Sequence, residues 1–150
     1  MKELHTYIDI AAPAQTVWDI LADFSAYPQW NPFVTEISGA SQVGGKLKVT
    51  LQQEVGGKPM VVRPTVIQWD TQRELAWRGR LAIPGVFAGE HHFCLASTQA
   101  GHTNLHQWER FTGILIPLIA KTLDTKTKPA FERMNAALKE RAEARVAPPS

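Results

Sequence analysis

Alternation of apolar and polar residues is the strongest pattern in this chain. In residues 46–55, KLKVTLQQEV, Leu47, Val49 and Leu51 fall on one face of an extended segment, as in a strand with one buried face. Comparable segments occur at residues 33–39, 59–70, 75–83, 89–97 and 102–113, and turns such as TQRE and TQAG separate several of them. Successive short strands joined by tight turns predict an antiparallel sheet.

The two ends of the chain complete this pattern. Residues 3–10 alternate and predict a first strand, and residues 12–24, APAQTVWDILADF, have the apolar spacing of a short helix. Residues 117–145 have mostly helical spacing and are rich in Ala, Lys, Glu and Arg. They predict one long helix that Pro129 kinks or divides. This helix would cover the apolar face of a curved sheet and leave a space beneath it for a ligand.

Residues 23–33, DFSAYPQWNPF, place four aromatic rings and two prolines in a short connection. The prolines fix local backbone angles, and the rings can bury large areas at low conformational cost. Two interpretations fit this segment. It is either a rigid plug that closes one edge of the core or a lip, centred on Trp30, that contacts a ligand.

Composition narrows the classes of function. The 150 residues include 16 Lys and Arg against 14 Asp and Glu, scattered along the chain, so we expect no nucleic-acid partner. The single cysteine, Cys94, excludes an internal disulfide. The first residues alternate instead of forming an apolar leader, which predicts a cytoplasmic protein. The apolar run 114–120 is far shorter than the roughly 20 residues of a spanning helix, so no stable membrane insertion is expected.

Several segments together resemble the SRPBCC superfamily, which includes START-like lipid carriers, birch pollen allergen relatives and polyketide cyclases. The segments are the first strand with APAQTVWDILADFSAYPQWNPFV, then RPTVIQWDTQRELAWRGRL, GEHHFCL, and LHQWERFTGIL before the long helix. The chain is most similar to the polyketide cyclase/dehydrase-like branch. A cavity, and not a catalytic signature, unites this superfamily, so the resemblance implies the fold more sharply than the chemistry.

The resemblance implies an α+β helix-grip fold. In this fold a curved antiparallel sheet of about seven strands wraps around a long C-terminal helix, and two short helices follow the first strand. We expect a single START-like domain over residues 1–145 and a flexible tail over residues 146–150.

Strand alternation also assigns side chains to faces. The inward faces are expected to hold Leu75, Trp77, Gly79 and Leu81, then His91, Phe93 and Leu95, then Leu105, Gln107, Glu109 and Phe111. The expected ligand-binding residues are Trp30, Phe33, Trp77, His91, Phe93, Gln107, Glu109, Phe111, Phe131, Met134 and Asn135.

Two polar residues on the inward face are the candidates for chemistry. A buried carboxylate needs a partner, a proton or water, so Glu109 either faces a ligand or pairs with Arg63 or another side chain. His91 is either a satisfied wall histidine or a general base, although the sequence places no nucleophile beside it. Trp30 and Trp77 can pack, bind, or do both.

The sequence gives less support for metal binding, for a cysteine nucleophile or for a nucleotide cofactor. His102 and His106 have the spacing of helical zinc ligands, but on a strand residues i and i+4 lie about 13 Å apart. Cys94 and His92 share the outward face without a third orienting group, so neither a metal site nor a nucleophile is expected. No cofactor is expected either, because the glycine pairs lack a nucleotide-binding pattern.

The leading hypothesis is a protein that binds a small hydrophobic or amphipathic molecule, lipid-like or polyketide-like, between sheet and helix. Loading would use Gly113 and Pro129 as flexible points. One alternative is a polyketide cyclase or dehydratase in which His91 or Glu109 moves protons. Another is a protein-interaction module with an incidental cavity. A homodimer is left open.

Overall fold

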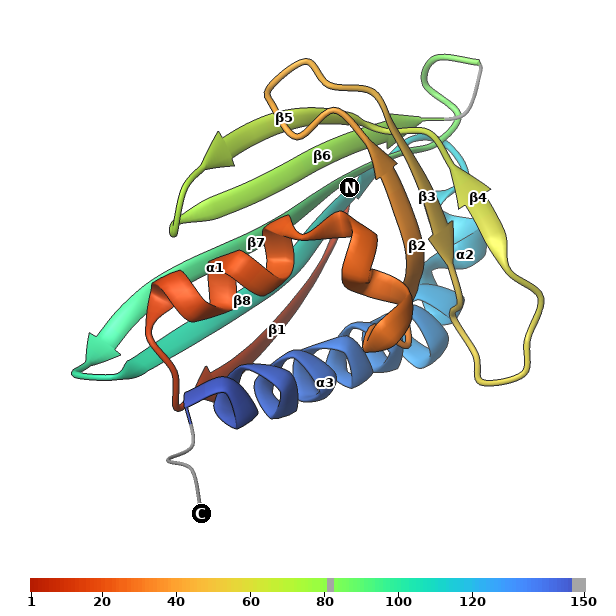
Figure 1. Cartoon of the computed structure of the whole chain (residues 1–150). Coiled ribbons are helices and arrows are strands. Elements are labelled where there is room, and N and C mark those ends of the chain that lie inside the picture. The colour runs from red at the N-terminus through yellow and green to blue at the C-terminus, as the bar shows by residue number, and fades with distance from the viewer. Residues whose placement is uncertain (81–82, 147–150) are drawn as a thin grey trace.

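The computed structural model describes residues 1–80 and 83–146. The elements in chain order are β1 (Lys2–Ile10), α1 (Ala14–Ala22), the 3₁₀ helix η1 (Phe24–Gln29), β2 (Val34–Gly39), β3 (Leu47–Leu51), β4 (Met60–Val62), β5 (Thr65–Asp70), β6 (Glu74–Arg80), β7 (Ala88–Gln99), β8 (His102–Thr112), α2 (Ile116–Thr122), the π-helical turn η2 (Leu123–Thr127) and α3 (Lys128–Val146). This order confirms the α+β helix-grip fold, including the two short helices after β1 (Figure 1).

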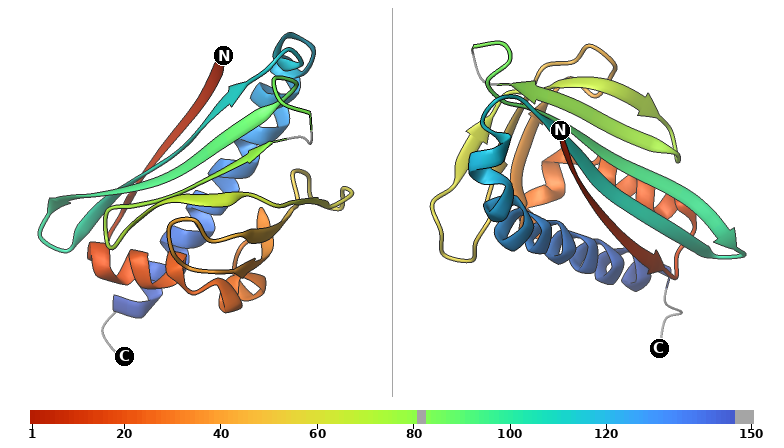
Figure 2. Two further views of the ribbon diagram at one scale, coloured as in Figure 1. Left: turned by 90° about the horizontal axis from the view of Figure 1, so that it is seen from above. Right: turned by 180° about the vertical axis from the view of Figure 1, so that it is seen from behind.

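The strands form two antiparallel sheets that together make one curved surface. The larger sheet has the order β1-β8-β7-β6-β5, and the smaller has the order β2-β3-β4. Backbone hydrogen bonds from Leu47 N to Pro64 O, at 2.9 Å, and from Val66 N to Gly45 O, at 2.9 Å, join them. The helical stretch from α2 to α3 lies across the concave side (Figure 2).

Residues 59–70, expected as one strand, are two strands in different sheets. β4 pairs with β3, whereas β5 pairs with β6. The break falls at Pro64, which has no N–H to donate to a ladder and restricts the backbone of Arg63 before it. The chain changes sheets there, and the described residues form eight strands instead of about seven.

The expected long helix over residues 117–145 is a helical stretch of 31 residues that widens in the middle. Pro129 has no N–H, and its ring would clash with the carbonyl group of Thr125, so regular hydrogen bonding cannot run through this point. The chain forms the π turn η2 instead, in which Lys128 N donates to Leu123 O. Of the expected flexible tail, Val146 still belongs to α3, and residues 147–150 lie outside the described part.

The concave side holds the core, as strand alternation predicts. Leu75, Phe93 and Leu105 are fully buried on the sheet, and they face a stripe on α3 formed by Phe131, Met134 and Leu138, each also at 0% exposure. Leu81, the fourth residue of the expected inward set on its strand, lies outside the described residues.

The aromatic segment closes one end of this core. The Tyr27 side chain is fully buried and donates its hydroxyl to Leu21 O at 2.7 Å, and burial raises its pKa far above the ordinary value. The Asn31 carbonyl oxygen accepts from Phe33 N and Val34 N at 3.0 and 2.9 Å. These bonds fix the corner into β2, as expected of a rigid plug.

No helix in residues 1–80 or 83–146 has the length and apolar character needed to cross a bilayer.

The helical stretch offers a matched test of the core. Leu138 is fully buried, whereas Leu118 is 80% exposed. We expect Leu138→Ala to lower the free energy of unfolding by about 2–5 kcal/mol because it leaves a cavity. Leu118→Ala should change it by less than about 0.5 kcal/mol. Urea denaturation followed by circular dichroism measures both, and equal losses would contradict this core.

Candidate functional site

A cavity of about 170 Å³ lies between the concave sheet and the helical stretch around η2. Its wall is mainly apolar and aromatic and is formed by Phe33, Leu51, Gln53, Met60, Val62, Pro64, Trp77, Gly79, Arg80, Phe87, Gly89, His91, Glu109, Phe111, Leu123 and Thr127. Met60 and Arg80 are exposed residues, so the cavity opens to solvent at their end. Concave apolar sites with a few polar groups are the usual form of small-molecule sites.

His91 and Glu109 form a polar pair in this wall. They lie opposite each other on β7 and β8, and His91 Nδ1 is 3.1 Å from Glu109 Oε1. The side chains are 5% and 16% exposed. Glycine at position 89 makes room for the pair, because a Cβ there would overlap Glu109 Oε2. The partner of Glu109 is therefore His91, whereas Arg63, the partner named as an alternative, is exposed.

A chain of buried hydrogen bonds continues from His91 to helix α3. His91 Nε2 lies 2.9 Å from Gln107 Oε1, and Gln107 Nε2 donates to Asn135 Oδ1 at 2.7 Å. Asn135 Nδ2 donates to Thr6 Oγ1, and that hydroxyl donates to Gln107 O, both at 2.8 Å. Because the Gln107 amide nitrogen is used in donation, its oxygen accepts from His91 Nε2–H.

This directionality leaves one proton to be shared between His91 and Glu109. With Nε2 protonated, the bond at Nδ1 needs a hydrogen either on Nδ1 or on Glu109. The pair is then an imidazolium with a carboxylate, or a neutral imidazole with a carboxylic acid. In either form the hydrogens are already donated within the network, so the free Glu109 oxygen can accept a hydrogen bond from a cavity ligand, and the pair can move a proton.

Thr127 is a further polar group in the wall that the sequence analysis missed. It is 3% exposed, and its Oγ1 has no hydrogen-bond partner among the residues that the structure describes. An unpaired buried hydroxyl is costly, and π turns are frequent at functional sites. Pro129 two residues later was the available sequence signal, because it forces the turn that places Thr127 here.

Ten of the eleven expected ligand-binding residues, all except Trp30, divide into two groups. Phe33, Trp77, His91, Glu109 and Phe111 are in the cavity wall. Five others are buried outside the wall: Phe93, Gln107, Phe131, Met134 and Asn135. Ring packing such as that of His91 on Phe93 and Phe131, with centroids 4.6 and 4.8 Å apart, fills the space in front of them.

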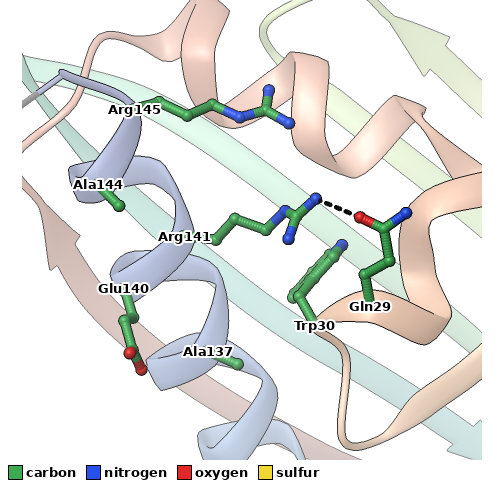
Figure 3. A pocket seen from close by; sticks show the side chains of 7 residues that line it. All are labelled: Gln29, Trp30, Ala137, Glu140, Arg141, Ala144 and Arg145. Carbon is green, nitrogen blue, oxygen red and sulfur yellow. Dashed lines mark hydrogen bonds between the residues drawn. The ribbon is translucent and has the colours of Figure 1, made fainter.

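Trp30 faces a different depression. Figure 3 shows it beside Gln29 and Arg141, in an open groove of about 560 Å³ between η1 and α3 that Arg145 also lines. Arg141 donates to Gln29 Oε1 at 3.0 Å. The ring packs against Tyr27 with centroids 5.2 Å apart. Trp30 therefore lies beside α3 and not at the central cavity, whereas Phe33 of the same segment is in the cavity wall.

Cys94 lies on the other face of the sheet, where burial raises the pKa of its thiol to about 11. The group is therefore a thiol at neutral pH, and thiols are weak nucleophiles.

The fold and the cavity together define a helix-grip protein with a space between sheet and helix. A family model described as polyketide cyclase / dehydrase and lipid transport matches residues 1–143. The chain belongs to this family. A search of curated proteins gives no significant match.

Several solved structures share the fold. The Zhui aromatase/cyclase from Streptomyces sp. R1128 has 19% identity and a TM-score of 0.78, over 97% of this chain and 96% of that chain. A START superfamily protein from Mycobacterium smegmatis has 22% identity and a TM-score of 0.72, over 96% and 99%. The di-domain aromatase/cyclase StfQ of the steffimycin pathway has 12% identity and a TM-score of 0.76, over 95% of this chain and 51% of that chain.

Two glycines allow the polar pair to be tested without touching either member. Gly79 and Gly89 are register partners on β6 and β7, and both line the cavity. We expect Gly89→Ala to push the Glu109 carboxyl away from His91 and to shift the ¹⁵N resonance of His91 Nδ1 in NMR spectra. Gly79→Ala should leave it unchanged, because its Cβ would meet Pro64 at an ordinary 3.6 Å. An equal response to both changes would contradict the geometry.

Proposed function

We propose that this chain binds a small hydrophobic or amphipathic molecule in the cavity between sheet and helix. The observation that carries the proposal is the composition of the wall, in which aromatic and aliphatic side chains predominate and Glu109 and Thr127 are polar members. Apolar burial would supply affinity at about 25 cal/mol per Å². The polar groups would orient the ligand.

The size of the cavity limits the part of the ligand that is enclosed. Its volume of about 170 Å³ is close to the roughly 150 Å³ of a cavity that holds benzene, and below the roughly 300–1,000 Å³ of drug-sized sites. One ring or a short branched chain therefore fits inside. A longer ligand would extend through the opening beside Met60 and Arg80.

The enclosed part should carry a hydroxyl or a carbonyl group. The free oxygen of Glu109 can accept a hydrogen bond, and a threonine hydroxyl such as that of Thr127 can donate or accept one. A purely aliphatic ligand would leave these groups unpaired, at a cost of about 1–3 kcal/mol for each.

A second candidate is a cyclase or dehydratase reaction on a polyketide-like substrate. The shared proton of the His91–Glu109 pair favours it, since one member could take a proton from an enclosed carbon or hydroxyl while the other stabilises the charge. Solved aromatase/cyclases share this fold, so the fold is compatible with such an activity. Turnover abolished by His91→Ala or Glu109→Gln in a folded protein would establish this reading.

The interaction-module alternative is supported less. A fully packed interior would have favoured it, and the cavity of about 170 Å³ speaks against such packing. The cytoplasmic location and the homodimer stay predictions from the sequence.

The binding proposal is tested by native mass spectrometry of protein purified without detergent, followed by denaturing extraction and titration with single-ring probes. We expect Gly79→Leu, which fills the cavity, to weaken probe binding at least tenfold, as a lost hydrophobic contact of about 1.4 kcal/mol would. The matched control is Arg78→Leu, at the preceding residue of β6, whose side chain is 57% exposed on the outer face. Equal affinities of the two variants would overturn the proposal.

Orientation is tested with phenol and toluene, which are similar in size and differ by one hydroxyl. We expect the native protein to prefer phenol, and Thr127→Val to reduce that preference about 2- to 12-fold, the worth of one hydrogen bond. Because Oγ1 has no partner among the described residues, the variant should keep its stability. Calorimetric titration measures both affinities, and an unchanged ratio in Thr127→Val would remove this residue from the site.

A further inference from the structure

Three side chains of different chemistry converge on the outer face of β6 and β7. His92 Nδ1 lies 2.7 Å from Glu74 Oε2, and Cys94 Sγ lies 3.6 Å from the same oxygen. The three donor atoms are all within 4.8 Å of one another. The cavity described above is on the opposite face of the sheet, so this cluster is a separate feature.

The strand register holds the cluster together. Glu74 and Cys94 are direct cross-strand partners, and His92 is two residues from Cys94 on the same face. Directly opposite side chains of an antiparallel pair lie about 4.5–5.5 Å apart at Cβ, and a diagonal neighbour is still within reach of a long side chain. The backbone of two hydrogen-bonded strands therefore preorganises the donor atoms without a loop.

The donors suit a borderline-soft divalent cation. Zn²⁺ takes imidazole nitrogen and carboxylate oxygen at about 2.0–2.2 Å and thiolate sulfur at about 2.3 Å, so tetrahedral donors are separated by roughly 3.3–3.7 Å. The 3.6 Å distance between Cys94 Sγ and Glu74 Oε2 lies in this range. The 2.7 Å distance between His92 Nδ1 and Glu74 Oε2 would have to increase by less than about 1 Å to reach it. Hard cations such as Mg²⁺ prefer oxygen ligands.

The surroundings of His92 also resemble those of a metal ligand. Its other nitrogen, Nε2, lies 2.9 Å from Glu90 Oε1, and Arg78 holds that carboxylate at 2.9 Å. A ligating histidine usually donates its second N–H to a carboxylate, which fixes the ring and leaves the other nitrogen for the metal. The Trp108 ring stacks on His92 with centroids 4.2 Å apart and fixes its plane.

We propose that Glu74, His92 and Cys94 form a binding site for Zn²⁺ or a similar transition-metal cation, with water at the fourth position. Binding displaces the thiol proton of Cys94 and the proton between His92 Nδ1 and Glu74, and both protons pass to solvent. Sequence spacing does not reveal this site, because Glu74 reaches it from another strand. Glu90 and Arg78 are positioning residues, since they act on the metal through His92.

A simple ion pair is the competing explanation, and it differs in the role of the thiol. A protonated His92 between Glu74 and Glu90 accounts for both short contacts without Cys94. A metal site needs Cys94 as a ligand, so a measurement that detects thiolate coordination separates the two explanations.

The test is titration of the reduced, metal-free protein with Co²⁺, followed by absorption spectroscopy and by competition with Zn²⁺. We expect a thiolate-to-cobalt charge-transfer band in the near ultraviolet and the visible bands of tetrahedral Co²⁺. Both should disappear in Cys94→Ser. Glu90→Gln should weaken Co²⁺ binding about 10- to 100-fold, as the loss of an outer partner does. Excess Mg²⁺ should not compete.

His102→Gln is the control, because His102 pairs with Asp9 away from the cluster. It should leave the spectrum and the affinity unchanged. Glu74→Gln is a second ligand variant, and circular dichroism verifies that each variant is folded. The absence of a charge-transfer band in the native protein, or equal Co²⁺ affinity in Cys94→Ser, would overturn the proposal.

Discussion

The hydrogen bonds of the buried Gln107 amide determine where the C-terminal helix lies on the sheet. Gln107 is fully buried on β8, and its amide reaches Asn135 Oδ1 and the backbone oxygen of Phe131 on α3. A buried amide without partners would cost several kcal/mol, so sheet and helix meet in one register. The same amide oxygen sets the orientation of His91, and through His91 it sets the polar pair in the cavity.

The cavity follows from this attachment together with one proline. Asn135 ties α3 close to the sheet, whereas Pro129 prevents regular helical bonding and leaves the wider turn η2. At η2, Leu123 and Thr127 become part of the cavity wall. Tight packing at one end and a wider turn at the other explain why this small domain keeps an enclosed space that its aromatic residues do not fill.

Sequence reasoning predicted the features that depend on periodicity. Alternation assigned Trp77, His91 and Glu109 to the inward face, and helical spacing placed Phe131 and Met134 on the buried side of the helix. It failed where one residue changes the course of the chain, as Pro64 does between β4 and β5. It also failed where the result depends on contacts between distant segments. Trp30 therefore faces a groove on α3, and Glu74 meets Cys94 across two strands.

The adjacent residues His91 and His92 show how one strand can serve two purposes. His91 points into the apolar cavity, while His92 points to the outer face, between Glu74 and Glu90. The inner face is the proposed binding site, and a crystal structure of the protein with phenol tests that proposal most directly. We expect the ring between Phe33, Trp77 and Phe111, with its hydroxyl hydrogen-bonded to Glu109 or Thr127. An empty cavity at saturating phenol, or phenol bound only in the groove beside Trp30, would contradict the account.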